Sequence, residues 1–74
     1  MERHAVQSSN LKAVGYDEAT QVLEVEFQNG NVYRYKGVGA GDHGAMMSAP
    51  SIGKAFYSRI RKNYAGERVE EDDS

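Results

Sequence analysis

Apolar and polar residues alternate most clearly between residues 21 and 28, and this alternation predicts a strand with one buried face. The apolar positions are Leu23, Val25 and Phe27. An Asn29-Gly30 pair follows and separates this run from the β-branched and aromatic residues of 31–36, which is a strong signal for a tight hairpin. We therefore predict an antiparallel hairpin as the centre of the fold.

Two hairpin registers fit the Asn-Gly pair, and the side-chain pattern favours one of them. A two-residue loop would place Val25 opposite Arg34 and mix apolar and charged side chains on one face. A three-residue loop over 28–30, with Gly30 at positive φ, places Val25 opposite Tyr33 instead. We predict the second register, whose buried face carries Leu23, Val25, Phe27, Tyr33 and Tyr35.

A third strand is predicted before the hairpin, over residues 11–17, with a turn at 17–20. Its alternation leaves two registers open: one buries Val14 and Tyr16, and the other buries Leu11 and Ala13. Residues 5–9 are either a further edge strand or a disordered lead-in. The sheet is thus predicted as a meander of three strands, or of four if residues 5–9 pair.

The segment after the hairpin contains four glycines within residues 37–44, which indicates a flexible connection. Asp42 can N-cap a short helix over 45–48, although Gly44 in its first turn costs about 1 kcal/mol relative to alanine. Pro50 ends that helix because it disfavours the helical conformation of the residue before it.

A longer amphipathic helix is predicted from Ser51, its N-cap, to about Tyr64, with Gly66 as a left-handed C-cap. Its apolar stripe is formed by Ile52, Phe56 and Ile60. This stripe needs a partner, and the apolar face of the hairpin is the large surface available. We predict an α+β domain over 1–66 and a disordered acidic tail over 67–74.

The composition fits one small domain, since the chain has 74 residues of which 39% are apolar. It contains no cysteine, which excludes disulfides and zinc-thiolate sites and is typical of a reducing compartment. No apolar run reaches membrane-spanning length, and no signal-peptide pattern opens the chain. We expect a cytoplasmic protein without a membrane partner.

Several short motifs occur in a distinctive order: Ser8-Ser9, Gly15-Tyr16-Asp17, Leu23-x-Val25-x-Phe27-x-Asn29-Gly30, Tyr33-x-Tyr35, Ser51-x-Gly53-x-x-Phe56 and Ile60-Arg61-x-x-Tyr64. Over residues 6–64 this order resembles the KTSC domain, which occurs at the C-terminus of some lysyl-tRNA synthetases and as a small bacterial or phage protein. The resemblance implies a small α+β domain for which RNA binding is the usual suggestion. Family members commonly have a Val-Pro step where this chain has Val38-Gly39, and often have Asn where it has Tyr57.

Basic residues gather in the second half of the chain, and they are the main functional signal. Residues 33–64 hold six cations against Asp42 alone, whereas residues 67–74 hold one arginine against five acids. The six cations are Arg34, Lys36, Lys54, Arg59, Arg61 and Lys62. With Tyr57 and Tyr64, which we expect to be exposed on the helix, they form a candidate surface for RNA or another polyanion. Glu24 and Glu26 are expected to share a sheet face with Arg34 and Lys36 and to neutralise them.

Other chemistry is less well supported by the sequence. Residues 39–44 fit the dinucleotide pattern G-x-G-x-x-G, but the chain has no room for a βαβ unit, so a hinge or mobile loop is expected there. No catalytic or metal-binding constellation occurs, so we expect a non-catalytic domain without a cofactor. The alternatives are a protein-interaction or self-assembly module that uses Met46, Met47 and the sheet edges, and, more weakly, a nucleotide pocket beneath the glycine-rich segment.

Overall fold

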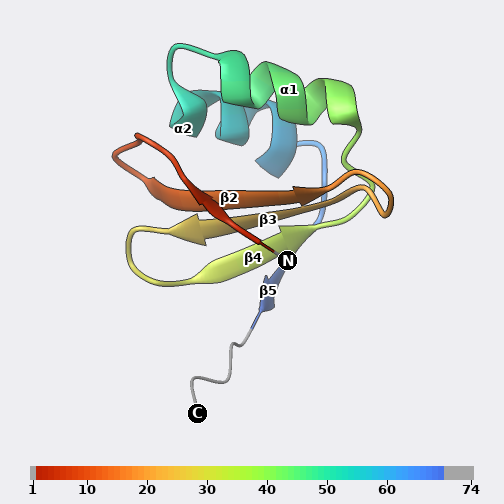
Figure 1. The fold of residues 1–74 in the computed structure, drawn as a ribbon, viewed down its shortest axis with the longest axis horizontal. Helices are drawn as coiled ribbons and strands as arrows, with labels where there is room; N and C mark the ends of the chain where they lie inside the picture. The colour runs from red at the N-terminus through yellow and green to blue at the C-terminus, as the bar shows by residue number, and fades with distance from the viewer. Residues whose placement is uncertain (1, 70–74) are drawn as a thin grey trace.

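A computed structural model describes residues 2–69 and contains one antiparallel sheet whose strands neighbour each other in chain order (Figure 1). Its strands are β1 (His4–Ala5), β2 (Leu11–Asp17), β3 (Val22–Phe27), β4 (Val32–Tyr35) and β5 (Gly66–Val69). Between β4 and β5 the chain forms α1 (Ala40–Ser48), α2 (Ile52–Ala55) and the π-helix η1 (Phe56–Arg61). Figure 1 shows the helices together on one face of the sheet. The predicted α+β class is confirmed, with five strands where three or four were expected.

The β3–β4 hairpin has the predicted register. Val25 lies opposite Tyr33, and Leu23 lies opposite Tyr35. The loop spans three residues: the Phe27 N–H donates to the Asn31 carbonyl at 2.8 Å, and Gly30 has a φ of 91°. Glycine occupies this position without steric cost, which explains why the Asn-Gly signal selects a bulged loop here.

Strand β2 contains a β-bulge that combines the two registers left open by its sequence. Leu11 pairs with Phe27 but Ala13 pairs with Glu26, so Lys12 is the additional residue. The extra residue shifts the alternation by one position, because side chains in a strand change face at every step. Leu11 and Val14 are therefore both buried, with exposed fractions of 0% and 3%.

Helix α1 differs from its prediction. It begins at Ala40 after Gly39, which makes no side-chain cap, and Asp42 lies within its first turn. The predicted Asp42 cap is thus wrong, and so are the flexible connection (37–44) and the mobile loop (39–44) over residues 40–44, which are helical. Residues 37–39 connect β4 to α1. Met46 is fully buried beneath this helix, and burial of a large side chain contributes roughly 1.5–3 kcal/mol, enough to offset glycines that cost about 1 kcal/mol each.

The C-terminal helix begins as predicted but ends earlier. The Ser51 hydroxyl accepts the Lys54 N–H at 3.3 Å, which confirms the N-cap. After Ala55 the backbone continues as η1 and ends at Arg61, before the expected Tyr64. Gly66 belongs to β5 and does not cap the helix, and the positive-φ glycines among residues 2–69 are Gly30 and Gly37.

Strand β5 replaces part of the tail that was expected to be disordered. Gly66 pairs with Tyr35 and Val69 pairs with Val32, so the chain returns along the edge of β4. Gly66 lies against the Tyr35 ring, and a Cβ at this position would be 2.7 Å from the ring atom Cζ. The remainder of the predicted tail, residues 70–74, lies outside the described residues.

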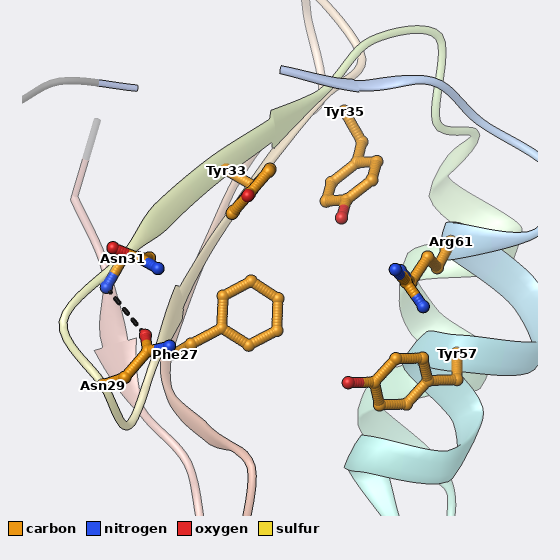
Figure 2. A pocket seen from close by; sticks show the side chains of 7 residues that line it. All are labelled: Phe27, Asn29, Asn31, Tyr33, Tyr35, Tyr57 and Arg61. Atoms are coloured by element: carbon orange, nitrogen blue, oxygen red, sulfur yellow. Dashed lines mark hydrogen bonds between the residues drawn. The ribbon is translucent and has the colours of Figure 1, made fainter. Parts of the chain in front are cut away.

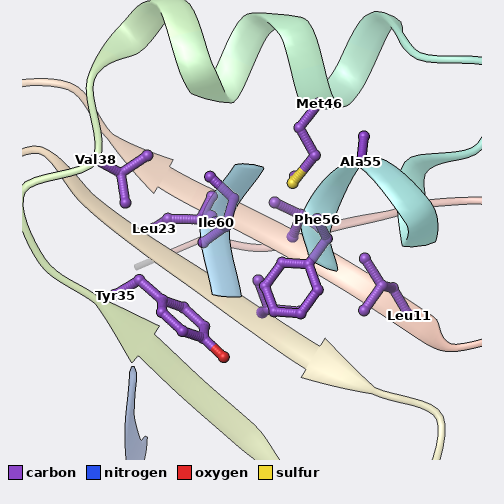
Figure 3. Close-up of a cluster of buried hydrophobic side chains, with 10 residues drawn as sticks. Leu11, Leu23, Tyr35, Val38, Met46, Ala55, Phe56 and Ile60 are labelled. Atoms are coloured by element: carbon purple, nitrogen blue, oxygen red, sulfur yellow. The ribbon is translucent and has the colours of Figure 1, made fainter. Parts of the chain in front are cut away.

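The core lies between the helices and the sheet (Figure 3). Phe56 is its central aromatic residue: its ring centroid is 5.6 Å from that of Phe27 and 5.4 Å from that of Tyr35, both edge to face. Ile60 is also fully buried, as predicted. Met46 points into the same cluster from α1 and is fully buried, which contradicts its expected role as a surface contact for a protein partner.

The opposite face of the sheet carries a charged cluster. Glu24 is only 3% exposed and accepts hydrogen bonds from Arg3 and, at 3.0 Å, from the Arg34 Nε. Glu26 lies 3.9 Å from the Lys12 ammonium. Arg34 therefore neutralises a buried carboxylate, as the sequence indicated, because buried charges are costly unless they are paired. Lys36, the other cation expected to pair with Glu24 and Glu26, has Glu67 as its carboxylate partner instead, at 3.9 Å. Within residues 2–69, no helix has the length and apolar content needed to cross a membrane.

Candidate functional site

An open cleft of about 230 Å³ lies between the β3–β4 hairpin and the C-terminal helix (Figure 2). We call it the aromatic cleft, and its lining residues are Phe27, Asn29, Asn31, Tyr33, Tyr35, Tyr57 and Arg61. Figure 2 shows that the strands supply one wall, with Tyr33 and Tyr35, and that the helix supplies the other, with Tyr57 and Arg61. The cleft thus combines ring surfaces with amide, hydroxyl and guanidinium groups.

The two hairpin tyrosines are walls of this cleft and do not form a flat exposed platform. Tyr35 is 4% exposed, and burial raises the pKa of its hydroxyl. Tyr33 is half-buried and meets the ring of Phe27 edge to face at 5.7 Å. Both rings therefore belong to the face covered by the helix, which agrees with the predicted hairpin register.

Tyr57 and Arg61 form the helical wall. The Arg61 guanidinium lies 5.4 Å from the centroid of the Tyr57 ring, within the range of a cation–π contact. Tyr57 is 38% exposed, as expected. The two residues stand four positions apart in η1, where i→i+5 hydrogen bonds widen the turn. An accessible ring and a cation therefore face the same opening.

Tyr64 does not join this wall, which corrects its predicted exposure. Its hydroxyl donates to Asp42 Oδ2 at 2.6 Å, and this hydrogen bond raises the pKa of Tyr64. The other carboxylate oxygen, Asp42 Oδ1, lies 3.6 Å from Arg59. Asp42 thus ties Tyr64 and Arg59 to α1.

The six candidate cations fall into two groups. Arg34, Arg59 and Lys36 have carboxylate partners, the last through an exposed pair with Glu67 at 3.9 Å. For the other three, no carboxylate of residues 2–69 lies within 4.0 Å. These three exposed residues are Lys54, Arg61 and Lys62. All three come from α2, η1 or the residue after it, so the members of the candidate set without a carboxylate partner lie along the C-terminal helix.

Asn29 and Asn31 line the cleft but were not among the candidate site residues from the sequence. The Asn29 side-chain oxygen accepts the Asn31 N–H at 3.0 Å, which holds the tip of the hairpin (Figure 2). The Asn31 side-chain oxygen lies 3.4 Å from a guanidinium nitrogen of Arg68. Asn29 lies within the predicted 28–30 loop and Asn31 follows it, so the sequence signal for the hairpin included both residues. Their position in the same cleft as Tyr57 depends on the tertiary fold.

A second aromatic pair, whose residues do not line the aromatic cleft, joins β2 to α1. The rings of Tyr16 and His43 stack at 4.3 Å with 12° between their planes, and the Tyr16 hydroxyl donates to the Val38 carbonyl at 2.6 Å. Burial lowers the pKa of His43, because it disfavours the charged imidazole. Among residues 2–69, no three His, Asp or Glu side chains are grouped as metal ligands would be.

The lowered pKa of His43 predicts that the free energy of unfolding depends on pH. The unfolded chain binds a proton at His43 more readily than the folded chain, so stability should be complete above the ordinary histidine pKa of about 6.5 and should fall as the pH drops below it. Thermal unfolding between pH 8 and pH 5 measures this loss. His43→Gln should reduce the pH dependence, whereas His4→Gln, at a side chain that is 75% exposed, serves as the control. Equal pH dependence in His43→Gln and the unmodified chain would contradict the prediction.

Comparisons with known proteins agree with the resemblance noted in the sequence. A family model described as the KTSC domain matches residues 7–64. An uncharacterized protein of Stutzerimonas stutzeri is 46% identical over 56 residues, which cover 76% of this chain and 79% of that protein. A lysine–tRNA ligase of Nostoc is 32% identical over 63 residues, which cover 85% of this chain but 11% of the ligase. The crystal structure of a KTSC domain protein from Yersinia pestis is similar to this chain, with a TM-score of 0.86 and 33% sequence identity. The match covers 93% of this chain and 97% of the Yersinia chain.

Proposed function

Because this chain belongs to the KTSC domain family, and a lysine–tRNA ligase is among its relatives, we propose that it binds RNA or a similar polyanion without catalysing a reaction. The relative acts on a tRNA, and a domain carried by such an enzyme has RNA within reach. The proposal gives the C-terminal helix the binding role and the sheet the supporting role.

The observation that carries the proposal is the position of Arg61, which lies against the exposed ring of Tyr57 and lines the aromatic cleft. A base that stacks on an aromatic side chain contributes about 1–3 kcal/mol, and an adjacent cation can contact the phosphate of the same nucleotide. Lys54 and Lys62 extend the positive surface along the helix. Ring and charge are thus arranged as single-stranded RNA would require.

The proposed interface is smaller than the set of residues suggested by the sequence. Arg34 holds the buried Glu24, and Arg59 and Tyr64 contact Asp42, so these three have structural partners. Lys36 pairs with Glu67, which lies opposite Arg34 in the sheet, so Lys36 belongs to the sheet face away from the helices. The proposed contacts are Lys54, Tyr57, Arg61 and Lys62.

The salt dependence of RNA binding tests this proposal. The affinity for a single-stranded RNA should fall steeply as salt rises, and Arg61→Ala should reduce the log–log slope by about 0.7 if one phosphate contact is lost. Lys12→Ala is the matched control, because Lys12 is an exposed cation that pairs with Glu26 on the opposite sheet face. Fluorescence anisotropy at several salt concentrations gives both quantities. If no RNA, including tRNA, binds even at low salt, the proposed function is wrong.

Self-association is the second candidate, and the sheet edges are the feature that favours it. Strand β5 has one neighbour, β4, and exposes Glu67 and Arg68. An edge strand can pair with another chain, although charged side chains oppose such pairing. Light scattering after size-exclusion chromatography separates the candidates, since self-assembly requires a mass above 8.2 kDa.

A further inference from the structure

Two more cavities continue the aromatic cleft along the side where the C-terminal helix meets the loops of the sheet. The middle cavity shares Phe27, Asn29 and Tyr57 with the aromatic cleft. It shares Ser9 and Asn10 with the third cavity, which Lys54 also lines. The first and third cavities have no lining residue in common, so the three follow one another in a line. We call this line of cavities the helix groove.

The sheet side of the helix groove is held in place by hydrogen bonds. The Gln28 side chain donates to the carbonyls of Leu11, at 3.1 Å, and Ser8, at 3.3 Å. The Gln28 backbone N–H donates to the Asn10 carbonyl at 3.0 Å. The hairpin loop and the Ser8–Leu11 segment therefore form one continuous wall, and a preorganised wall reduces the entropy lost on binding.

The shape of the helix groove favours a chain over a compact small molecule. Its three cavities measure about 230, 260 and 300 Å³ and follow one another in a line, so each lies at or below the lower end of the roughly 300–1,000 Å³ range of small-ligand pockets. Each cavity alone suits one part of a ligand, and their continuity suits a polymer. The nucleotide pocket expected beneath the glycine-rich segment has no such support, because residues 40–48 form α1.

The chemistry of the helix groove changes along its length. Aromatic rings and Arg61 lie at one end, Asn10 and Asn29 lie in the middle, and Lys54 lies at the other end. Amide side chains both donate and accept hydrogen bonds, as the edges of unpaired bases require. The two cations are separated by the length of the groove, which suits phosphates at successive positions of a strand.

We propose that the helix groove binds a single strand of RNA, with one unstacked base in the aromatic cleft and the backbone passing Asn10 toward Lys54. This inference rests on the proposed function and adds the path and the form of the ligand. A duplex cannot follow the same path, because its bases are paired and stacked and cannot enter the cleft.

A substitution in the middle of the helix groove tests the path. Ser9 is exposed and lines two of the cavities, so Ser9→Glu places a negative charge between the two cations. We expect the affinity for a fluorescein-labelled single-stranded RNA to fall by about fivefold or more, because like charges at contact distance repel by about 1 kcal/mol even in water. Thr20→Glu makes the same change of net charge in the exposed β2–β3 turn, at the opposite end of β3 from the hairpin loop, and should leave the affinity within about twofold. Circular dichroism verifies that both variants are folded.

Changes in the RNA test the base-binding role of the cleft. One abasic residue in an otherwise identical strand should weaken binding by about 5- to 150-fold at the position that occupies the cleft. The duplex form should bind more weakly than the single strand. Equal affinity for both forms, or equal effects of Ser9→Glu and Thr20→Glu, would overturn the helix-groove inference and leave the proposed function intact. Absence of all RNA binding by the unmodified chain would instead remove the proposed function and the inference together.

Discussion

Phe56→Ala is expected to leave most of the chain unfolded at room temperature. The Phe56 side chain is fully buried and contacts the rings of Phe27, Tyr35 and Tyr57. Removing such a side chain costs about 3–5 kcal/mol, whereas a single core in a chain of this length supplies roughly 3–5 kcal/mol in total. Chemical denaturation followed by circular dichroism measures the loss.

Tyr57→Ala is the matched control for this prediction, because it removes the neighbouring aromatic residue of the same helix. Tyr57 is 38% exposed, so its removal should cost much less than removal of Phe56. Phe56→Leu retains most of the buried apolar surface and should remain folded, with reduced stability. A cooperative unfolding transition in Phe56→Ala at the denaturant concentration of the unmodified chain would show that this ring does not hold the helix on the sheet.

The second large effect is expected at Gly66, where the backbone of β5 lies against the Tyr35 ring. A Cβ at Gly66 would be 2.7 Å from Cζ and 3.0 Å from the hydroxyl oxygen of Tyr35. Since that ring is 4% exposed, it has little space to move, and either β5 or the ring must shift. We expect Gly66→Ala to lower the free energy of unfolding by about 1–3 kcal/mol.

Gly44→Ala provides a control of opposite sign. Gly44 lies inside α1, and a Cβ there would meet no heavy atom within 4 Å. The same substitution should therefore stabilise the chain by about 0.5–1 kcal/mol, because glycine loses more conformational freedom on folding than alanine. Thermal unfolding of the two variants measures both shifts. A stabilising effect of Gly66→Ala would mean that β5 can leave the Tyr35 ring without cost.

The elements that the sequence predicted correctly depend on local patterns. The register of the hairpin follows from the alternation of Leu23, Val25 and Phe27 together with the positive φ of Gly30. The burial of Phe56 and Ile60 follows from their four-residue spacing on a helix that needs an apolar partner. In each case, residues close in the sequence determine which face is buried.

The elements that were missed depend on contacts between distant segments. Strand β5 contains one apolar residue, Val69, and it forms because the edge of β4 offers free hydrogen-bonding groups. Helix α1 starts among glycines because Met46 is buried against the rest of the core. Tyr64 is held by Asp42, 22 positions away. Secondary-structure propensity and hydrophobic periodicity carry no information on such contacts between residues that are far apart in the sequence.

Only part of the aromatic cleft was expected to be a binding surface. Tyr57 and Arg61 were candidate binding residues from the sequence, whereas Tyr33 and Tyr35 were predicted as residues of the buried sheet face; all four line the aromatic cleft. The asparagines of the hairpin and the Ser9-Asn10 wall were missed, since they become neighbours of the helix only after folding. The sequence also placed too many cations in the candidate binding surface. Arg34 and Arg59 have carboxylate partners on other elements of the fold, which the sequence pattern does not reveal.

The direction of β5 bears on how binding to this protein should be measured. Val69 pairs with Val32, immediately beside Asn31, so a fluorophore attached at Val69 would lie next to the cleft lining. Such an attachment would compete with the ligand or screen its charge. Because the chain contains no cysteine, a single Thr20→Cys substitution offers a unique thiol for labelling in the β2–β3 turn, away from the hairpin loop.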